Sequence, residues 1–317
     1  MMKKIALLSY LFICIFTISC GQNTTKNDRA KTMENYQYKT TKRTIYGMDL
    51  TVPGPYEIYI NDIVARKDYG TGMHNTFIEI NPYVLKSGTY QFTLKLLPMP
   101  SEAAKGGIQP STIDFLKVAV SSYEKTGTKE QPQSYEKIKL YPITKINKPV
   151  PFYEVKGEFT VDLPYELEGW SNGQDLSKMD KDELEKKVLA FYEKIKNSLN
   201  KGNVELFNQF NSQRTAETYI FNYTPPQEIT KIEDENINDL KNCKDRMAPI
   251  EDYSLKIYGN GKLVKLERNL RTELYGVEKN IAGMNALIRK GKVKGYKEFP
   301  TLIYLPEGSN DFVIIRK

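Results

Sequence analysis

Residues 43–168 constrain the fold most, because short runs of alternating apolar and polar residues recur there without a helical period. In residues 89–96 the alternation puts four apolar side chains on one face, since successive side chains of a strand point to opposite faces. These four are Tyr90, Phe92, Leu94 and Leu96. Prolines stand between the runs, where they end strands rather than interrupt them. The pattern predicts an antiparallel β-sandwich.

Further strands are predicted at residues 56–60, 76–80, 115–123 and 152–163. Residues 56–62, 77–88 and 90–96 look like part of a galactose-binding-like jelly roll, in which a strand ends in an asparagine turn and a Leu-Lys-x-Gly corner leads into the last strand. The corner in this chain is Leu85-Lys-Ser-Gly88. The resemblance is confined to these residues, and it implies a sandwich rather than a particular ligand.

The pattern changes to a helical one after residues 171–177, which are predicted to form a linker. Asp180 followed by Glu183 is typical of a helix N-terminus, where the first side chain caps a free amide of the first turn. Apolar residues then recur at helical spacing and predict one buried stripe. The stripe consists of Leu184, Val188, Phe191, Ile195 and Leu199.

Two further helices and two hairpins are predicted in the second half of the chain. Gly202 ends the first helix, Asn203 caps a second short helix through Phe210, and a weaker third helix spans residues 232–247. The hairpins lie at residues 253–266 and 299–315. The first turns at Asn260-Gly261, a pair that accepts the positive φ of a type I′ turn. Helices followed by antiparallel strands predict an α+β domain, and their order is similar to NTF2-like and cystatin-like folds.

The first twenty residues have the three-part layout of a secretory signal. Two lysines precede an apolar run at residues 5–17, and the small residue Ser19 stands before Cys20. The layout resembles the signal peptide and lipobox of a bacterial lipoprotein, although Thr17 stands where the lipobox usually has leucine. That resemblance implies that Cys20 is acylated and becomes the first mature residue. The alternatives are an uncleaved N-terminal anchor and an ordinary secretory signal.

The same resemblance implies where the protein resides. Gly21 takes the second mature position, where many inner-membrane lipoproteins of Gram-negative bacteria carry aspartate, so the outer membrane is favoured over the inner one. The lipid bilayer is then a partner through acylated Cys20. The residues that follow Cys20 are polar and poor in aliphatics, which is typical of a flexible tether. The predicted organisation is a signal peptide at residues 1–19, a lipidated tether at 20–42, a β-sandwich domain at 43–170 and an α+β domain at 171–317.

Charge, histidine count and cysteine count exclude several classes of function. The formal net charge is +7, two lysines leave with the signal, and the others are scattered among acidic residues, so nucleic acid is not an expected partner. His74 is the single histidine, which excludes a multi-histidine metal site. Neither Gly-x-Ser-x-Gly nor His-Glu-x-x-His occurs, so no catalytic residue, metal or cofactor is expected. Cys243 is the single cysteine after Cys20 and is predicted to be a buried small hydrophobe.

Four residues are candidates for ligand contact: His74, Tyr69, Trp170 and Tyr165. The first two belong to a glycine-rich loop, and loops often carry ligand contacts, although a solvated histidine is the simpler interpretation of His74. The chain has 22 tyrosines against one tryptophan, and a tyrosine offers both an apolar face and a polar tip for recognition. Trp170 precedes the linker, where it would either wedge the two domains together or stack on a sugar. The wedge is favoured, because a tryptophan at a junction needs a partner surface.

Together these features predict a membrane-anchored envelope lipoprotein that binds an unknown protein or glycan without catalysis. One alternative is an immunity lipoprotein that neutralises an envelope-targeted toxin. Another is a glycan hydrolase that uses two carboxylates as acid and base. The acidic run Glu233-Asp-Glu235 with Asp239 is predicted to be the solvated face of the third helix, because charge runs usually face water.

Overall fold

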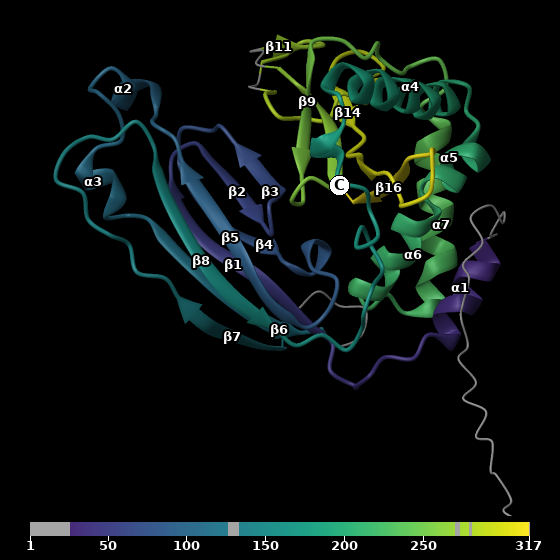
Figure 1. Ribbon diagram of the computed structural model, residues 1–317, viewed down its shortest axis with the longest axis horizontal. Helices are drawn as coiled ribbons and strands as arrows, with labels where there is room; N and C mark the ends of the chain where they lie inside the picture. Colours follow the sequence, from purple (N-terminus) through teal and green to yellow (C-terminus); the bar gives the residue numbers. More distant parts are fainter. Residues whose placement is uncertain (1–25, 126–132, 270–272, 279–280, 317) are drawn as a thin grey trace, which may run out of the picture.

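A computed structural model describes residues 26–125, 133–269, 273–278 and 281–316. The signal peptide, Cys20 and the first residues of the predicted tether lie outside these described residues. Figure 1 shows a β-sandwich on one side and a layer of helices with a further sheet on the other. The predicted α+β class is confirmed, with strands first and helices before a second antiparallel region. No helix among the described residues is long and apolar enough to cross a membrane.

Two four-stranded antiparallel sheets form the sandwich, with strand orders β4-β1-β6-β7 and β3-β2-β5-β8. The first sheet consists of β1 (Thr44–Pro53), β4 (Met73–Glu79), β6 (Lys117–Glu124) and β7 (Gln133–Leu140). The second sheet consists of β2 (Tyr56–Ile60), β3 (Ile63–Asp68), β5 (Gly88–Leu96) and β8 (Tyr153–Val161). Four short helical turns lie outside the sheets: α2 (Pro100–Ala103), α3 (Pro110–Ile113), η1 (Asn81–Tyr83) and η2 (Leu176–Lys178).

Strand β5 shows how the alternating pattern builds the sandwich. Phe92, Leu94 and Leu96 are at most 2% exposed, and burying each such side chain contributes about 1.5–3 kcal/mol. Tyr90, the fourth residue of the predicted face, is only partly buried at the start of the strand. The intervening polar residues point to the outer face of the sheet, and part of that face forms one wall of the candidate site.

Helix α4 (Lys181–Asn200) forms as the sequence predicts. The Asp180 carboxylate accepts a hydrogen bond from the Glu183 amide at 2.9 Å and so caps the first turn. All five residues of the predicted stripe are buried. They pack in a second hydrophobic core with apolar residues of the C-terminal strands.

Three shorter helices follow, namely α5 (Val204–Phe210), α6 (Ser212–Phe221) and α7 (Pro226–Lys241). Asn203 caps α5 as predicted, because its side chain accepts a hydrogen bond from the Leu206 amide at 3.0 Å. Helix α6 is not among the predicted helices. Helix α7 begins earlier than the predicted residue 232, because Pro226 opens its first turn, where a helix needs no free backbone amide. It also ends at Lys241 rather than at the predicted residue 247. Cys243 follows α7 and is buried, as predicted.

The C-terminal sheet has the order β16-β15-β10-β9 and confirms both predicted hairpins. Its strands are β9 (Tyr253–Tyr258), β10 (Leu263–Arg268), β15 (Leu302–Tyr304) and β16 (Val313–Arg316). The β9–β10 turn has four residues rather than the two of a type I′ turn, and Gly259, Asn260 and Gly261 all have positive φ. Two ribbons complete the described strands: β11 (Glu273–Leu274) with β12 (Val277–Glu278), and β13 (Ile288–Lys290) with β14 (Tyr296–Glu298).

Helix α1 (Lys26–Asn35) lies beside α7, within the segment predicted to be a tether (Figure 1). Met33 is buried with Tyr219 and Ile229, and Arg29 forms an ion pair with Glu233 at 2.8 Å. The structure differs here from a flexible tether, and the solvated-face prediction is wrong for Glu233, which is 5% exposed. A mostly polar helix that docks through a few inward side chains has the composition of a linker, so the sequence pattern does not show it.

One hydrophobic core runs from the sandwich into the C-terminal half of the chain. Trp170 is 5% exposed and lies in this core together with apolar residues of both sandwich sheets and of β15 and β16. The guanidinium of Arg316 lies over the rings of Trp170 and Phe221, at 5.2 and 5.0 Å from their centroids. Its Nε donates a hydrogen bond to the Pro82 carbonyl in the sandwich at 2.8 Å. Trp170 therefore occupies the position of a wedge between the two halves.

Candidate functional site

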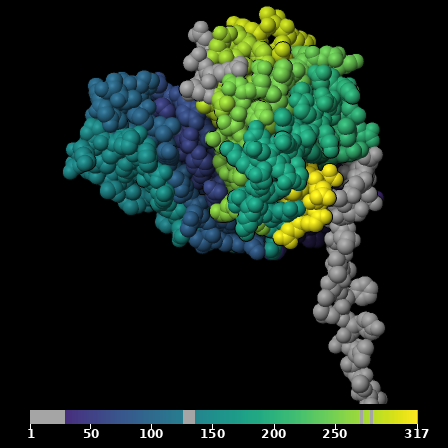
Figure 2. Space-filling model, turned by 45° about the horizontal axis from the view of Figure 1, so that its top comes forward, coloured from purple at the N-terminus to yellow at the C-terminus, as the bar shows by residue number. Residues whose placement is uncertain are grey.

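A pocket of about 390 Å³ opens where the sandwich meets the C-terminal half. Figure 2 shows the surface hollowed between the blue and purple sandwich and the green C-terminal residues. Three segments form the pocket: the β2–β3 turn, the outer face of β5 and the β9–β10 turn. The lining residues are Tyr59, Asn61, Asp62, Gln91, Phe92, Thr93 and Asn260.

The two turns that line the pocket have left-handed backbones. Asn61 and Asp62 form the two-residue connection between β2 and β3, with φ of 50° and 62°, which is the geometry of a type I′ turn. Asn260 has φ of 54° in the β9–β10 turn. Asparagine and aspartate tolerate this region better than other residues with a side chain, because their short polar groups bond locally. The turn geometry therefore selects the same residue types that line the pocket.

Hydrogen bonds join the two turns and fix one wall of the pocket against the other. The Asn260 amide donates to Asp62 Oδ2 at 2.8 Å, and the Gly259 amide donates to the Asp62 carbonyl at 3.1 Å. Gly259 has φ of 61°, and a Cβ at this position would lie 2.8 Å from a methyl carbon of Leu263. Glycine is needed at position 259 because a side chain there would clash with Leu263 and displace the β9–β10 turn from the β2–β3 turn. The pocket consequently exists only when both halves of the chain are in place.

Several polar side chains in the pocket make no hydrogen bond within the described part of the chain. They are the amides of Asn61 and Asn260, the hydroxyl of Thr93 and the Oδ1 atom of Asp62. Gln91 differs, because its amide donates to Glu158 at 3.2 Å. These groups lie on a concave surface and retain their capacity to donate and accept. They can therefore bind a polar ligand without first breaking an internal contact.

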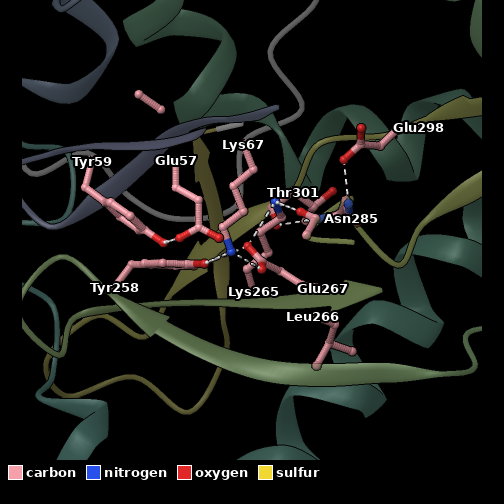
Figure 3. Close-up of polar contacts among 12 residues, drawn as sticks. Glu57, Tyr59, Lys67, Tyr258, Lys265, Leu266, Glu267, Asn285, Glu298 and Thr301 are labelled. Atoms are coloured by element: carbon pink, nitrogen blue, oxygen red, sulfur yellow. Dashed lines mark hydrogen bonds and ion pairs between the residues drawn. The ribbon is translucent and has the colours of Figure 1, made fainter. Parts of the chain in front are cut away.

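A buried polar network adjoins Tyr59 of the pocket lining and joins the sandwich to the C-terminal sheet (Figure 3). We call Lys67, Tyr258, Lys265 and Glu267 the junction network. Lys67 from β3 pairs with Glu267 of β10 at 2.7 Å, and the Tyr258 hydroxyl donates to the same carboxylate at 2.7 Å. Lys265 lies 3.4 Å from it. Burial acts to raise the pKa of the Glu267 carboxyl, but Lys265 and Lys67 outweigh it, and the pKa lies below its usual value.

A second carboxylate, Glu57, binds two tyrosines, and Figure 3 shows the first of them, Tyr59, beside this network. Tyr59 donates to Glu57 at 2.6 Å and Tyr69 donates to it at 2.7 Å. Burial and the adjacent Glu57 carboxylate raise the pKa of both phenols, so both keep their protons and remain donors. The Tyr59 ring is tilted against the Tyr258 ring, with 6.4 Å between centroids. The Tyr59 ring, which forms the aromatic wall of the pocket, is therefore held in place by the hydrogen bond of its hydroxyl and by the Tyr258 ring.

The four residues predicted to contact a ligand lie outside the pocket lining. His74 lies on β4, where its Nε2 is 3.1 Å from the Gly70 carbonyl and its Nδ1 is 3.6 Å from Asp68. Tyr69 is bound to Glu57 and stands behind the pocket rather than in it. Trp170 and Tyr165 are buried at 5% and 1% exposure, so neither presents its ring to solvent.

The residues that line the pocket are not among the four predicted ligand contacts. Asn61-Asp62 and Asn260-Gly261 are recognisable as turns, but only the folded chain brings the two turns together. One usable signal is that each turn asparagine, Asn61 and Asn260, stands two positions after a tyrosine, Tyr59 and Tyr258. That pattern identifies residues of the two turns, but it does not show that the turns lie close together in the folded chain.

The lining residues do not form a catalytic constellation. Asp62 is the one carboxylate among them, and no histidine, cysteine, lysine or arginine is present. Glycoside hydrolysis uses two carboxyl groups on either side of the bond to be cleaved. Glu57 and Glu267 are close by, but each already accepts hydrogen bonds from neighbouring side chains. Within the described ranges, no cluster of histidine, cysteine and carboxylate side chains could hold a metal ion.

No protein-family model, no curated protein and no solved structure matches this chain. The likeness to lipoprotein signals, to a galactose-binding-like jelly roll and to NTF2-like or cystatin-like folds therefore stays a prediction from the sequence.

Proposed function

We propose that the protein is a lipid-anchored envelope protein that binds a glycan, without chemical turnover, in the pocket at the junction of its two halves. The observation that carries this proposal is the set of unbonded hydroxyl, amide and carboxylate groups on Thr93, Asn61, Asn260 and Asp62, beside the Tyr59 ring. Sugars present many hydroxyls and an apolar face, and this combination of groups is complementary to both.

The size of the pocket favours a glycan over a protein partner. A stable protein interface buries about 800 Å² on each partner. A recess of about 390 Å³ suits instead a ligand of one or two sugar units. The absence of a second free carboxylate from its lining argues against the hydrolase alternative.

The anchor is tested by replacing Cys20 with serine. If Cys20 is acylated, the Cys20→Ser protein will take up no labelled fatty acid and will leave the membrane fraction, because the acyl chains supply the membrane affinity. The matched control is Cys14→Ser, which removes the other cysteine of the first twenty residues and is expected to keep both label and membrane attachment. Membrane attachment of Cys20→Ser at the level of the unchanged protein would refute the anchor.

The pocket is tested by filling it with a tryptophan from β5. Thr93→Trp is expected to weaken binding to oligosaccharides of the cell envelope by at least about tenfold, because the indole occupies the space of the ligand. Thr89→Trp is the matched control, since Thr89 lies on the same outer face of β5 but outside the lining. Affinity is measured by titration calorimetry on the full mature protein, with thermal unfolding as a check on both variants.

Three outcomes of that titration count against the proposal. Equal loss in Thr93→Trp and Thr89→Trp would mean that the pocket is not the site. Turnover of an oligosaccharide by the unchanged protein would favour the hydrolase alternative. Capture of one stoichiometric envelope-targeted toxin, with no binding to any glycan, would favour the immunity alternative.

A further inference from the structure

We infer that the pocket selects an uncharged glycan over an anionic one, and that Asp62 makes this selection by accepting hydroxyl groups of the ligand. The inference rests on the proposed function, because it concerns the ligand of the same pocket. It goes further by assigning the chemical class of the ligand and the residue that sets it.

The charges around the pocket favour a neutral ligand. Asp62 is the one charged residue among the lining residues. An anionic sugar is bound most strongly where a cation faces it, since hydrogen bonds between ionised groups are about twice as strong as those between neutral ones. Cations outside the lining already have partners: Lys156, opposite Thr93 on β8, lies 3.0 Å from Glu154, Lys67 pairs with Glu267 at 2.7 Å, and Lys262 donates to the Ser171 carbonyl. A carboxylate, sulfate or phosphate in the pocket would meet the Asp62 carboxylate, and no lining residue carries a positive charge to offset the repulsion.

The geometry of Asp62 leaves it able to accept from a ligand. Its Oδ2 atom accepts one hydrogen bond, from the Asn260 amide at 2.8 Å. A carboxylate has about four acceptor positions, so the Oδ1 atom and the remaining position on Oδ2 stay open. Adjacent hydroxyls of a sugar can donate to the two oxygens together. The Asn260 contact also holds the carboxylate in one orientation before the ligand arrives.

The rest of the lining suits the same class of ligand. Asn61 and Asn260 each offer an amide that donates and accepts, and a sugar hydroxyl also does both. Both asparagines sit on tight turns, so little backbone freedom is lost on binding. Tyr59 is held by its hydrogen bond to Glu57 and presents a partly exposed ring, on which the C–H face of a sugar can pack.

The test compares matched neutral and anionic sugars on the full mature protein. The probes are disaccharides of glucose, galactose, mannose and N-acetylglucosamine, each beside its 6-sulfated counterpart. For the unchanged protein we expect at least one neutral disaccharide to bind about tenfold or more tightly than its sulfated form. Asp62→Asn should reduce this preference to within about threefold, because asparagine keeps an acceptor for the Asn260 amide but removes the charge.

The control is Asp114→Asn, the same change at an exposed aspartate outside the pocket, which should leave the preference unchanged. Thermal unfolding of each variant separates a loss of binding from a loss of the fold. If a sulfated sugar binds more tightly than its neutral form and Thr93→Trp abolishes that binding, the inference is overturned and the proposed function stands. If no probe binds, or if binding survives Thr93→Trp, the proposed function is overturned together with the inference.

Discussion

Replacing Arg316 by methionine is expected to lower the free energy of unfolding by about 3–5 kcal/mol, because the change leaves the Glu217 carboxylate buried without its cation. The two side chains are 2% and 8% exposed, and Nη2 of the arginine lies 2.8 Å from Oε2 of the glutamate. Neither of these two atoms has a hydrogen-bond partner, so their attraction is Coulombic. The substitution also removes the hydrogen bond from Nε to Pro82 and the cation over the Trp170 ring.

The measurement is chemical denaturation of the purified protein, with a second substitution to isolate the pair. Arg316→Met combined with Glu217→Leu should recover much of the lost stability, since apolar groups often replace a buried ion pair at little net cost. Lys39→Met is the matched control at an exposed pair, because Lys39 and Glu166 are 62% and 53% exposed. It is expected to cost no more than about 1 kcal/mol. An equally small effect of Arg316→Met would contradict the role assigned to Arg316.

The second large effect is expected for Glu267→Gln in the junction network. The change leaves Lys67 and Lys265 with 12% and 8% exposed side chains and no carboxylate between them, which should cost about 3–5 kcal/mol. Glu154→Gln is the matched control, because Glu154 pairs with Lys156 at 3.0 Å on the exposed face of the sandwich. Its cost is expected to stay within about 1 kcal/mol. Similar losses of unfolding free energy in Glu267→Gln and Glu154→Gln would show that burial of the ion pair does not determine the cost of breaking it.

The same carboxylate predicts a dependence on pH. The pKa of Glu267 in the folded protein lies below its usual value, so the unfolded chain binds a proton more readily than the folded one. The stabilisation is therefore complete above the usual glutamate pKa of about 4.3 and declines as the pH falls through the lower folded value. The difference in unfolding free energy between the unchanged protein and Glu267→Gln should follow that decline. A difference that stays constant from pH 7 to pH 3 would exclude this carboxylate as its source.

Features with a local cause could be predicted from the sequence. The α4 stripe and the Asp180 cap are confirmed, because helical spacing and an end signal lie within a few residues of each other. The alternation in β5 and the β9–β10 hairpin are confirmed for the same reason. Cys243 is buried as predicted, although it lies after the end of α7 rather than on the apolar face of that helix.

The junction could not be predicted, because its contacts join residues far apart in the chain. The hydrogen bond between Asn260 and Asp62 spans 198 positions, and that between Lys67 and Glu267 spans 200. No periodicity or motif marks such pairs in a single sequence. The wedge position of Trp170 is the exception, since a lone tryptophan beside a linker indicates a nearby surface even when that surface is unknown.

If Cys20 is the proposed lipid anchor, the docking of α1 limits how far the body of the protein can stand from the membrane. A flexible chain from Cys20 to residue 42 would span at most roughly 75 Å when fully extended. With Lys26 already part of the docked helix, the free length from an acylated Cys20 shrinks to roughly 20 Å. The distance between the pocket and the bilayer would then vary over a narrow range rather than a wide one. A force applied through the lipid would also act on the Arg29–Glu233 ion pair, which holds α1 to α7, before it acted on the sandwich.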